Sequence, residues 1–159
     1  MINTKEPFVM ILVGPTLSGK STFIRKNYPD VDVISRDEIV MQLHGSRDYN
    51  AAFREVDQKA VDRILSQRLS DAGRSKKSAI IDMTNMTAKR RRQSLSNFGS
   101  EFEKIAVVFP ILSDEEYERR NISRNAAESK WIPPHVIKGM VDSYEEPTAE
   151  EGFDRIFFV

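Results

Sequence analysis

The chain has 159 residues, of which 40% are hydrophobic and 30% are charged, and its 24 basic and 24 acidic side chains leave a formal net charge of zero. This length and composition predict one domain, residues 1–159, with an ordinary buried core. The zero net charge argues against a protein that coats duplex nucleic acid, although it leaves room for a local basic site that binds a few phosphates.

Cysteine is absent and the two histidines are His44 and His135, so this chain has no disulfide framework, thiolate metal site or cysteine nucleophile. No apolar stretch approaches the length of a membrane span. Residues 1–7 lack the apolar core of a signal peptide. We therefore expect a soluble, intracellular protein of the cytoplasm, or of the host cytoplasm if the source is a virus, with no membrane partner.

The first predicted strand, Phe8–Val13, is a continuous apolar run, which is typical of a strand buried on both faces of a parallel sheet. It leads into residues 14–21, which spell G-x-x-x-x-G-K-S, the phosphate-binding P-loop pattern. A short helix is predicted over Ser21–Lys26, with Pro29 just past its end. A strand, a glycine-rich loop and a helix in this order are the context that the motif needs; the alternative is a turn that binds nothing.

This loop predicts a site for ATP and Mg²⁺. Gly14 and Gly19 let the backbone turn tightly and approach an anion, whose charge the loop N–H groups then face. Lys20 is expected to place its ammonium against the β- and γ-phosphates, and Ser21 to offer its hydroxyl to Mg²⁺. The predicted ATP-binding residues of this segment are Gly14, Pro15, Thr16, Leu17, Ser18, Gly19, Lys20, Ser21 and Thr22.

A second predicted strand, Asp32–Ile34, is followed by Ser35 and Glu38 at capping-box spacing, which predicts a helix as far as Leu43. Asp37 then lies in the first turn, at the carboxyl edge of the sheet, where ligands bind in open α/β folds. The helix dipole favours the ionised form of this carboxyl group. Position alone leaves two interpretations open, a functional carboxylate and an ordinary first-turn acid.

A long helix is predicted over Ala51–Ala72, closed by Gly73. Its apolar side chains recur at helical spacing, which predicts core packing by Phe53, Val56, Ala60, Ile64 and Leu65. The next predicted strand, Ser78–Asp82, has the form of a Walker B strand, whose Asp82 would hold Mg²⁺ directly or through water. Thr84 and Asn85 follow at the same edge of the sheet.

Thr87 is positioned to cap a further helix, which carries four consecutive cations, Lys89–Arg92. Such a run points around a helix, so a solvated helix start is one interpretation. The other interpretation is a phosphate-binding patch that includes Arg90. Cations near a helix N-terminus oppose the helix dipole, which argues against a purely structural role for this run.

A fourth strand is predicted over Glu103–Phe109, and Ser113 caps the helix that follows. Arg120 and Arg124 lie at i and i+4, on one face of this helix. Guanidinium groups suit bidentate phosphate contacts, so we expect the two arginines to form part of a lid over the transferred group, at about residues 119–132. A surface helix paired with Glu116 and Glu118 is the alternative.

The rest of the chain completes an α/β pattern. Trp131 lies in a loop, where it either anchors the loop on the core or stacks on a base. A helix is predicted from Pro134 to Tyr144, one more turn over residues 148–151, and a final strand over Phe153–Val159. Apolar runs that alternate with helical patterns predict an α/β domain with a mostly parallel sheet of about five strands flanked by helices.

Several segments together resemble the P-loop 5′-hydroxyl polynucleotide kinases, namely the phage-type enzymes and the kinase domain of the eukaryotic polynucleotide kinase-phosphatase. The order and spacing agree along nearly the whole chain. The matching segments are the P-loop, Ser35-Arg36-Asp37, Asp82-Met83-Thr84-Asn85, Arg120-Asn121-Ile122-Ser123-Arg124 and the tail from Tyr144 to Phe153. Ser35 stands where the family often has Asn, and the phosphatase motif D-x-D-x-T/V is absent from this chain.

The resemblance implies a P-loop NTPase-type kinase that uses ATP and Mg²⁺, with a nucleic-acid 5′ end as the substrate and nucleic-acid repair as the context. It implies that Asp37 is the general base toward the 5′-hydroxyl and that Arg36 positions a substrate phosphate. Arg120 and Arg124 would contact the donor phosphates. Thr84 and Asn85 match a motif at the catalytic edge, where substrate binding is expected.

Two other classes of function remain open on the sequence. The first is a kinase for a small alcohol or a free nucleoside, which the zero net charge fits comfortably. The second is a non-catalytic nucleotide-dependent interaction module, although a candidate base and paired lid arginines are more than a switch needs.

Overall fold

The computed structural model describes residues 1–159 as one five-stranded sheet with helices on both faces. The strands lie in the order β2-β3-β1-β4-β5 and every neighbouring pair is parallel. Their bounds are β1 Phe8–Val13, β2 Asp32–Ile34, β3 Ala79–Ile81, β4 Glu103–Val108 and β5 Arg155–Phe158. The predicted parallel α/β sheet is therefore confirmed, and each strand lies within two residues of its predicted bounds.

Strand β1 is the centre of the sheet. All six of its residues are buried, because β3 and β4 flank it and helices cover both of its faces. Residues Phe8, Met10 and Leu12 face one hydrophobic cluster, whereas Val9, Ile11 and Val13 face the other. A strand covered on both faces needs no polar side chain, which explains the unbroken apolar run.

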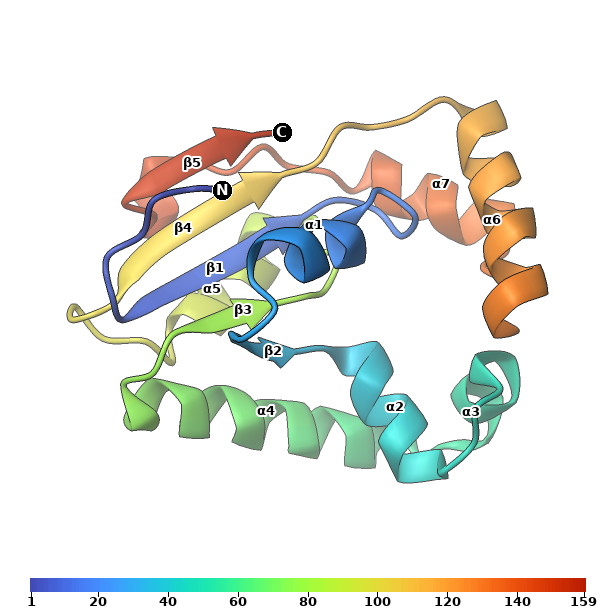
Figure 1. Ribbon diagram of the computed structural model, residues 1–159, viewed down its shortest axis with the longest axis horizontal. Coiled ribbons are helices and arrows are strands. Elements are labelled where there is room, and N and C mark those ends of the chain that lie inside the picture. Colours follow the sequence, from blue (N-terminus) through green and yellow to red (C-terminus); the bar gives the residue numbers. More distant parts are fainter.

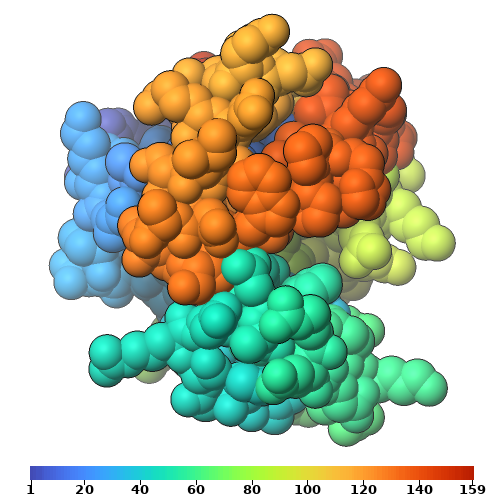
Figure 2. Space-filling model, turned by 90° about the vertical axis from the view of Figure 1, so that its right-hand side faces the viewer, coloured from blue at the N-terminus to red at the C-terminus, as the bar shows by residue number.

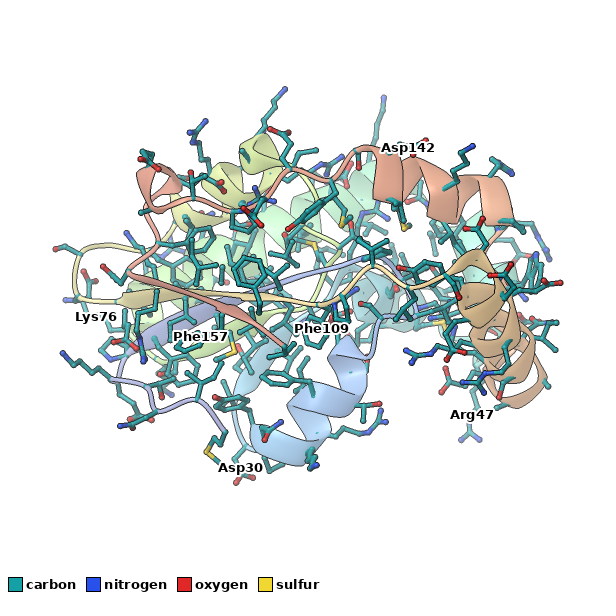
Figure 3. All side chains as sticks on the ribbon, turned by 90° about the horizontal axis from the view of Figure 1, so that it is seen from above. Asp30, Arg47, Lys76, Phe109, Asp142 and Phe157 are labelled. Atoms are coloured by element: carbon teal, nitrogen blue, oxygen red, sulfur yellow. The ribbon has the colours of Figure 1, made fainter.

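Seven α-helices and one 3₁₀ turn connect the strands. They are α1 Lys20–Asn27, α2 Arg36–His44, α3 Tyr49–Glu55, α4 Gln58–Ser75, α5 Ala88–Leu95, α6 Asp114–Glu128, α7 Pro134–Asp142 and η1 Ala149–Glu151. Helix α1 lies on one face of the sheet and α4 and α5 lie on the other, as seen from above in Figure 3. None of the helices combines the length and the apolar character that a membrane span requires.

Three of the predicted helix starts are confirmed by their capping contacts. The hydroxyls of Ser35, Thr87 and Ser113 each accept a hydrogen bond from the backbone N–H three residues later, at 3.2–3.3 Å. Each contact satisfies one of the N–H groups that a helix start leaves without a partner. The starts of α2, α5 and α6 are therefore fixed by local sequence.

The single long helix predicted over residues 51–72 is wrong. Helix α3 ends at Glu55, and α4 begins at Gln58 with the Asp57 side chain accepting the N–H of Lys59. The break turns the chain, so Phe53 and Ile64 of the predicted core stripe are exposed. Their places in the core are taken by residues of another face of α4, namely Val61, Leu69 and Ala72.

Gly73 does not end the helix as predicted, because α4 continues to Ser75 and Lys76 adopts the left-handed cap conformation. Gly73 instead lies against the backbone of the loop after α5. A Cβ atom built on it would lie 1.8 Å from the carbonyl oxygen of Asn97. The glycine is therefore needed for a close approach between α4 and this loop.

The sheet directs several loops toward one side of the molecule. In Figure 1 the strand arrows point toward the side on which α2, α3, α6 and α7 lie. The P-loop follows β1 there, Asp37 follows β2 and Asp82 follows β3. Residues far apart in sequence thus meet at the carboxyl edge, where open α/β sheets bind ligands.

Candidate active site

A large cleft, with a volume of about 990 Å³, opens at the carboxyl edge of the sheet. Of the predicted site residues, Gly14 and Pro15 do not line this cleft. The others do, namely the P-loop from Thr16 to Thr22, Arg36, Asp37, Asp82, Thr84, Asn85, Arg90, Arg120 and Arg124. Most of the lining is polar, with both signs of charge present. The sequence prediction that these segments gather at one edge is therefore confirmed, whereas their individual roles stay predictions.

The P-loop is a tight turn whose glycines have distinct tasks. Gly19 has a φ of 99° at the start of α1, in the left-handed region that favours glycine. A Cβ atom on Gly14 would lie 2.8 Å from Ser18 Oγ and 3.0 Å from Phe109 Cβ, so the loop packs closely there. Leu17 also has positive φ, at 69°, which is a strained backbone conformation for a residue other than glycine.

Lys20 points back into the loop. Its Nζ donates to the carbonyl oxygens of Gly14 and Pro15 at 2.6 and 2.7 Å, and the residue is 8% exposed. Burial lowers the pKa of Lys20 to about 8, although the carboxylates of Asp82 and Asp37 partly oppose this. The ammonium therefore lies within the field of both acids, and a bound phosphate would compete with the loop carbonyl oxygens for its N–H donors.

The residues expected to hold Mg²⁺ are compatible with that ion. Ser21 is in the first turn of α1 and Asp82 follows β3, and both line the cleft. Mg²⁺ usually takes one or two protein oxygens and completes its shell with phosphates and water, so a hydroxyl with one carboxylate is a sufficient donor set. No group of three His, Asp or Glu side chains forms a metal site by itself. Burial raises the pKa of Asp82, and Lys20 counters it in part.

Asp37 lies in the first turn of α2 as predicted, and it has two partners that the sequence did not reveal. Tyr49 Oη donates to Asp37 Oδ1 at 2.9 Å, and Lys130 Nζ donates to Asp37 Oδ2 at 2.6 Å. Burial raises the pKa of the Asp37 carboxyl, but the Lys130 ammonium and the two hydrogen bonds outweigh it, leaving the pKa below its usual value. The carboxylate is therefore ionised and directed into the cleft.

Arg36 lines the cleft, but its guanidinium is turned toward α4. Its Nη2 donates to Gln58 Oε1 at 2.7 Å and to Asp62 Oδ1 at 3.2 Å. These contacts tie the start of α2 to the start of α4. A substrate phosphate that binds Arg36 would therefore compete with, or share, these two partners.

Arg120 and Arg124 of α6 lie over the P-loop. Arg120 Nη1 donates to the carbonyl of Leu17 at 2.9 Å while its Nε contacts Glu116, and Arg124 Nη2 donates to Thr16 Oγ1 at 3.1 Å. The Nε atom of Arg124 is buried and has no hydrogen-bond partner. The spare donors of an arginine so close to the P-loop are suited to an additional anion.

Thr84 and Asn85 shape the loop after β3. The carbonyl of Thr84 accepts the N–H of Gly14 at 3.0 Å. Asn85 is buried, has a φ of 49°, and donates through Nδ2 to the carbonyls of Leu12, Met83 and, more distantly, Ile81. These bonds connect the loop to the end of β1, so Asn85 has a structural task in addition to the substrate contact predicted for it.

The four cations of α5 have different environments. Lys89, Arg90 and Arg92 are exposed, and Arg90 lines the cleft as the phosphate-patch interpretation requires. Arg91 is fully buried and forms an ion pair with Glu151, which sequence reasoning missed. The only local hint was the position of Arg91 on the same helix face as Ser94 and Leu95, which are buried as well.

Comparison with known proteins agrees with this geometry. The family model described as "AAA domain" matches residues 9–147, so the chain belongs to this family. The chain is 29% identical over 159 residues to "Transcription factor bHLH140" of Arabidopsis thaliana, covering 96% of this chain and 16% of that protein. It spans less than a quarter of the length of the curated relatives it matches.

Solved structures identify the type of fold. A chain of the Pnkp1/Rnl/Hen1 RNA repair complex superposes with a TM-score of 0.68 and 25% identity, covering 89% of this chain and 45% of that one. Kti12 of Chaetomium thermophilum, solved in complex with ADP-AlF3, superposes with a TM-score of 0.65 and 16% identity, covering 95% and 88%. The protein thus has a P-loop kinase-like fold, a fold built to bind a nucleotide.

Proposed function

We propose that the protein is an ATP-dependent kinase that transfers the γ-phosphoryl group to the 5′-hydroxyl of a polynucleotide end. One observation carries the proposal: Asp37 lies in the same cleft as Lys20 of the P-loop and as Arg120 and Arg124 of α6. A phosphotransferase needs this combination, because the acceptor hydroxyl must lose a proton while negative charge on the donor is neutralised. A binding module needs only the nucleotide contacts.

Each residue has a defined part in the reaction. The 5′-hydroxyl oxygen forms a bond to the γ-phosphorus as the bond between that phosphorus and the ADP oxygen breaks, and Asp37 takes the hydroxyl proton. Lys20 binds the donor phosphates, and Arg120 and Arg124 balance the charge spread over the transferred group. Ser21 and Asp82 would hold Mg²⁺, which would supply further charge neutralisation when bound. Residues 119–132, which carry both arginines, act as the lid.

A polynucleotide is favoured as the acceptor by two observations. The exposed Arg90 of α5 lies on the wall of the cleft and provides a place for a further phosphate of a strand. One of the similar structures is part of an RNA repair complex. A small alcohol or free nucleoside remains the second candidate, and the balanced net charge of the chain favours it.

The proposal is tested by incubating the protein with γ-labelled ATP, Mg²⁺ and a 5′-hydroxyl oligonucleotide, beside free nucleosides and small alcohols. We expect label on the oligonucleotide. The apparent affinity for this acceptor should fall with salt through counterion release, whereas a neutral small acceptor should barely respond. Label only on a small acceptor would overturn the substrate, and no transfer to any alcohol would favour the non-catalytic module.

The variant Asp37→Asn tests the base, and Glu38→Gln is its matched control. Both acids lie in the first turn of α2, but Glu38 does not line the cleft. We expect Asp37→Asn to lower turnover by about 10²–10⁴-fold, the usual contribution of a positioned base, with ATP affinity largely kept. Glu38→Gln should retain turnover. Equal turnover in the two variants would contradict the role of Asp37.

A further inference from the structure

Lys130, in the loop after α6, contacts the acceptor side of the cleft. Its Nζ donates to Asp37 Oδ2 at 2.6 Å and lies 4.2 Å from the centroid of the Tyr49 ring. Its side chain is 15% exposed. Arg120 and Arg124, by contrast, contact Leu17 and Thr16 of the P-loop. The lid therefore presents two cations to the donor site and a third to the candidate base.

This contact leaves Asp37 poorly suited to accept a proton. Each carboxylate oxygen already accepts a hydrogen bond, one from Tyr49 and one from Lys130. An adjacent ammonium stabilises the ionised carboxylate and so weakens it as a base. An acceptor hydroxyl must approach the same oxygens, so the Lys130 ammonium has to move away before Asp37 can act as a strong base.

The backbone around Lys130 is held, so the movement falls to its side chain. The carbonyl of Ser129 accepts the N–H of Asn50, and the N–H of Trp131 donates to Asn50 Oδ1. Asn50 of α3 thus fixes both neighbours of Lys130. Figure 2 shows α3 and the α6–α7 segment meeting across this face of the molecule. A lysine side chain has four rotatable methylenes, so its ammonium can swing between partners without moving the loop.

We propose that Lys130 is a specificity-determining gate on Asp37, which it pairs with and masks until an anionic group of the acceptor takes over its ammonium. This inference rests on the proposed kinase function and deepens it. An acceptor that carries a phosphate close to the reacting hydroxyl provides the replacement partner and frees the base. A neutral acceptor leaves the ion pair in place and is phosphorylated poorly, even where it fits the cleft.

The test compares two acceptors that differ only in the anion, uridine and uridine 3′-monophosphate, with ATP and Mg²⁺. The variant Lys130→Met keeps the unbranched stem over Tyr49 and removes the charge, and Lys130→Arg keeps the charge. Lys138→Met is the matched control, because Lys138 is an exposed lysine of α7 outside the cleft. Circular dichroism checks that each variant is folded.

We expect the wild-type protein to prefer uridine 3′-monophosphate in kcat/KM. Lys130→Met should reduce that preference by at least about tenfold, the value of a charged hydrogen bond, without lowering kcat/KM for uridine. Lys130→Arg should retain most of the preference, and Lys138→Met all of it. A ratio unchanged in Lys130→Met, or an equal loss with both acceptors, would overturn the gate and leave the kinase function standing.

Binding provides a readout that needs no turnover. Trp131 is the only tryptophan and directly follows Lys130, so its fluorescence reports the environment of the gate. Titration with uridine 3′-monophosphate should give a saturable change that uridine does not give and that Lys130→Met abolishes. If no acceptor is phosphorylated, the proposed kinase function is wrong. The titration then still shows whether the acceptor phosphate binds to Lys130. An identical response in wild-type protein and Lys130→Met would refute it.

Discussion

Arg91 and Glu151 form an ion pair that is almost completely shielded from solvent. Arg91 Nε lies 2.6 Å from Glu151 Oε1, and the two side chains are 0% and 2% exposed. Arg91 Nη1 also donates to the carbonyl of Asn85, and Glu151 accepts the N–H of Thr148. One buried pair therefore joins α5, η1 and the loop after β3 that borders the cleft.

Breaking this pair should strongly destabilise the protein. Glu151→Gln leaves the Arg91 guanidinium buried without a counter-charge, which typically costs about 3–5 kcal/mol of unfolding free energy. Replacing both residues, as Arg91→Met with Glu151→Leu, should recover much of this loss. Urea denaturation followed by circular dichroism measures both effects. If the unfolding free energy of Glu151→Gln lies within about 1 kcal/mol of that of the wild type, the ion pair is not needed for stability.

The same pair gives stability a defined dependence on pH. Burial raises the pKa of Glu151, but the hydrogen bonds from Arg91 and Thr148 outweigh it, so the folded-state pKa lies below that of the unfolded chain. The stabilisation is therefore complete above the ordinary glutamate pKa and is lost as pH falls through the folded-state value. Acid titration of unfolding should show wild type approaching the Glu151→Gln variant in stability at low pH.

Arg124 and Arg119, which both lie in α6, offer a matched comparison. Arg124 contacts Thr16 in the P-loop, whereas Arg119 is exposed and pairs with Glu116 on its own helix. Arg124→Ala should reduce kcat by about 10²–10³-fold, because a cation that stabilises the developing charge is lost. Arg119→Ala should leave kcat near wild type. Similar kinetics for the two variants would remove Arg124 from the proposed catalytic set.

Nucleotide binding should be coupled to proton uptake by Lys20. The pKa of this lysine is lowered to about 8 by burial, and bound phosphates would raise it because they favour the ammonium form. Above pH 8 the free protein therefore has a partly neutral Lys20 that must gain a proton on binding ATP, so affinity falls as pH rises. Calorimetry at pH 8.5 in two buffers of different ionisation enthalpy measures the uptake. Binding without proton exchange would mean that Lys20 is already fully charged.

Replacing two helical glycines by alanine should change the stability of the protein in opposite directions. Gly73→Ala places a Cβ atom against the carbonyl of Asn97, a backbone group that cannot move aside cheaply, so about 1–3 kcal/mol of stability should be lost. A Cβ atom added to Gly139 of α7 would meet no neighbouring atom within 4 Å, and Gly139→Ala should stabilise by about 0.4–1 kcal/mol. Thermal unfolding measures both. A stable Gly73→Ala variant would mean that the loop after α5 is free to shift.

Local signals predicted most of the fold. The P-loop, the apolar strands and the hydroxyl caps Ser35, Thr87 and Ser113 depend on neighbours within a few residues, and all of them appear as expected. The break between α3 and α4 was missed although Asp57 carries a capping signal, because apolar spacing continued through it. Periodicity alone does not reveal that a helix stops and restarts in another direction.

The candidate site was predicted less completely, because its missing parts depend on long-range contacts. Lys130 is 93 residues from Asp37 in the sequence, and no pattern around either residue indicates that they meet. Likewise, the sequence does not distinguish the four adjacent cations of α5 from one another. Only Arg91 is buried, because it pairs with Glu151, 60 residues away. Motif spacing located the edge of the sheet where chemistry is expected, whereas the partners of each side chain come from tertiary packing.

The central position of β1 also has a consequence for biosynthesis. This strand is translated before both of its neighbours, since Val9 pairs with Ala79 and Phe8 with Glu103. At a translation rate of about 5–20 residues per second, β1 remains without β4 for on the order of 5–20 s. A nascent chain with such an unpaired strand is exposed to misassociation in this interval. The order of synthesis thus makes the most buried segment of the finished protein the one that remains longest without its partner strand.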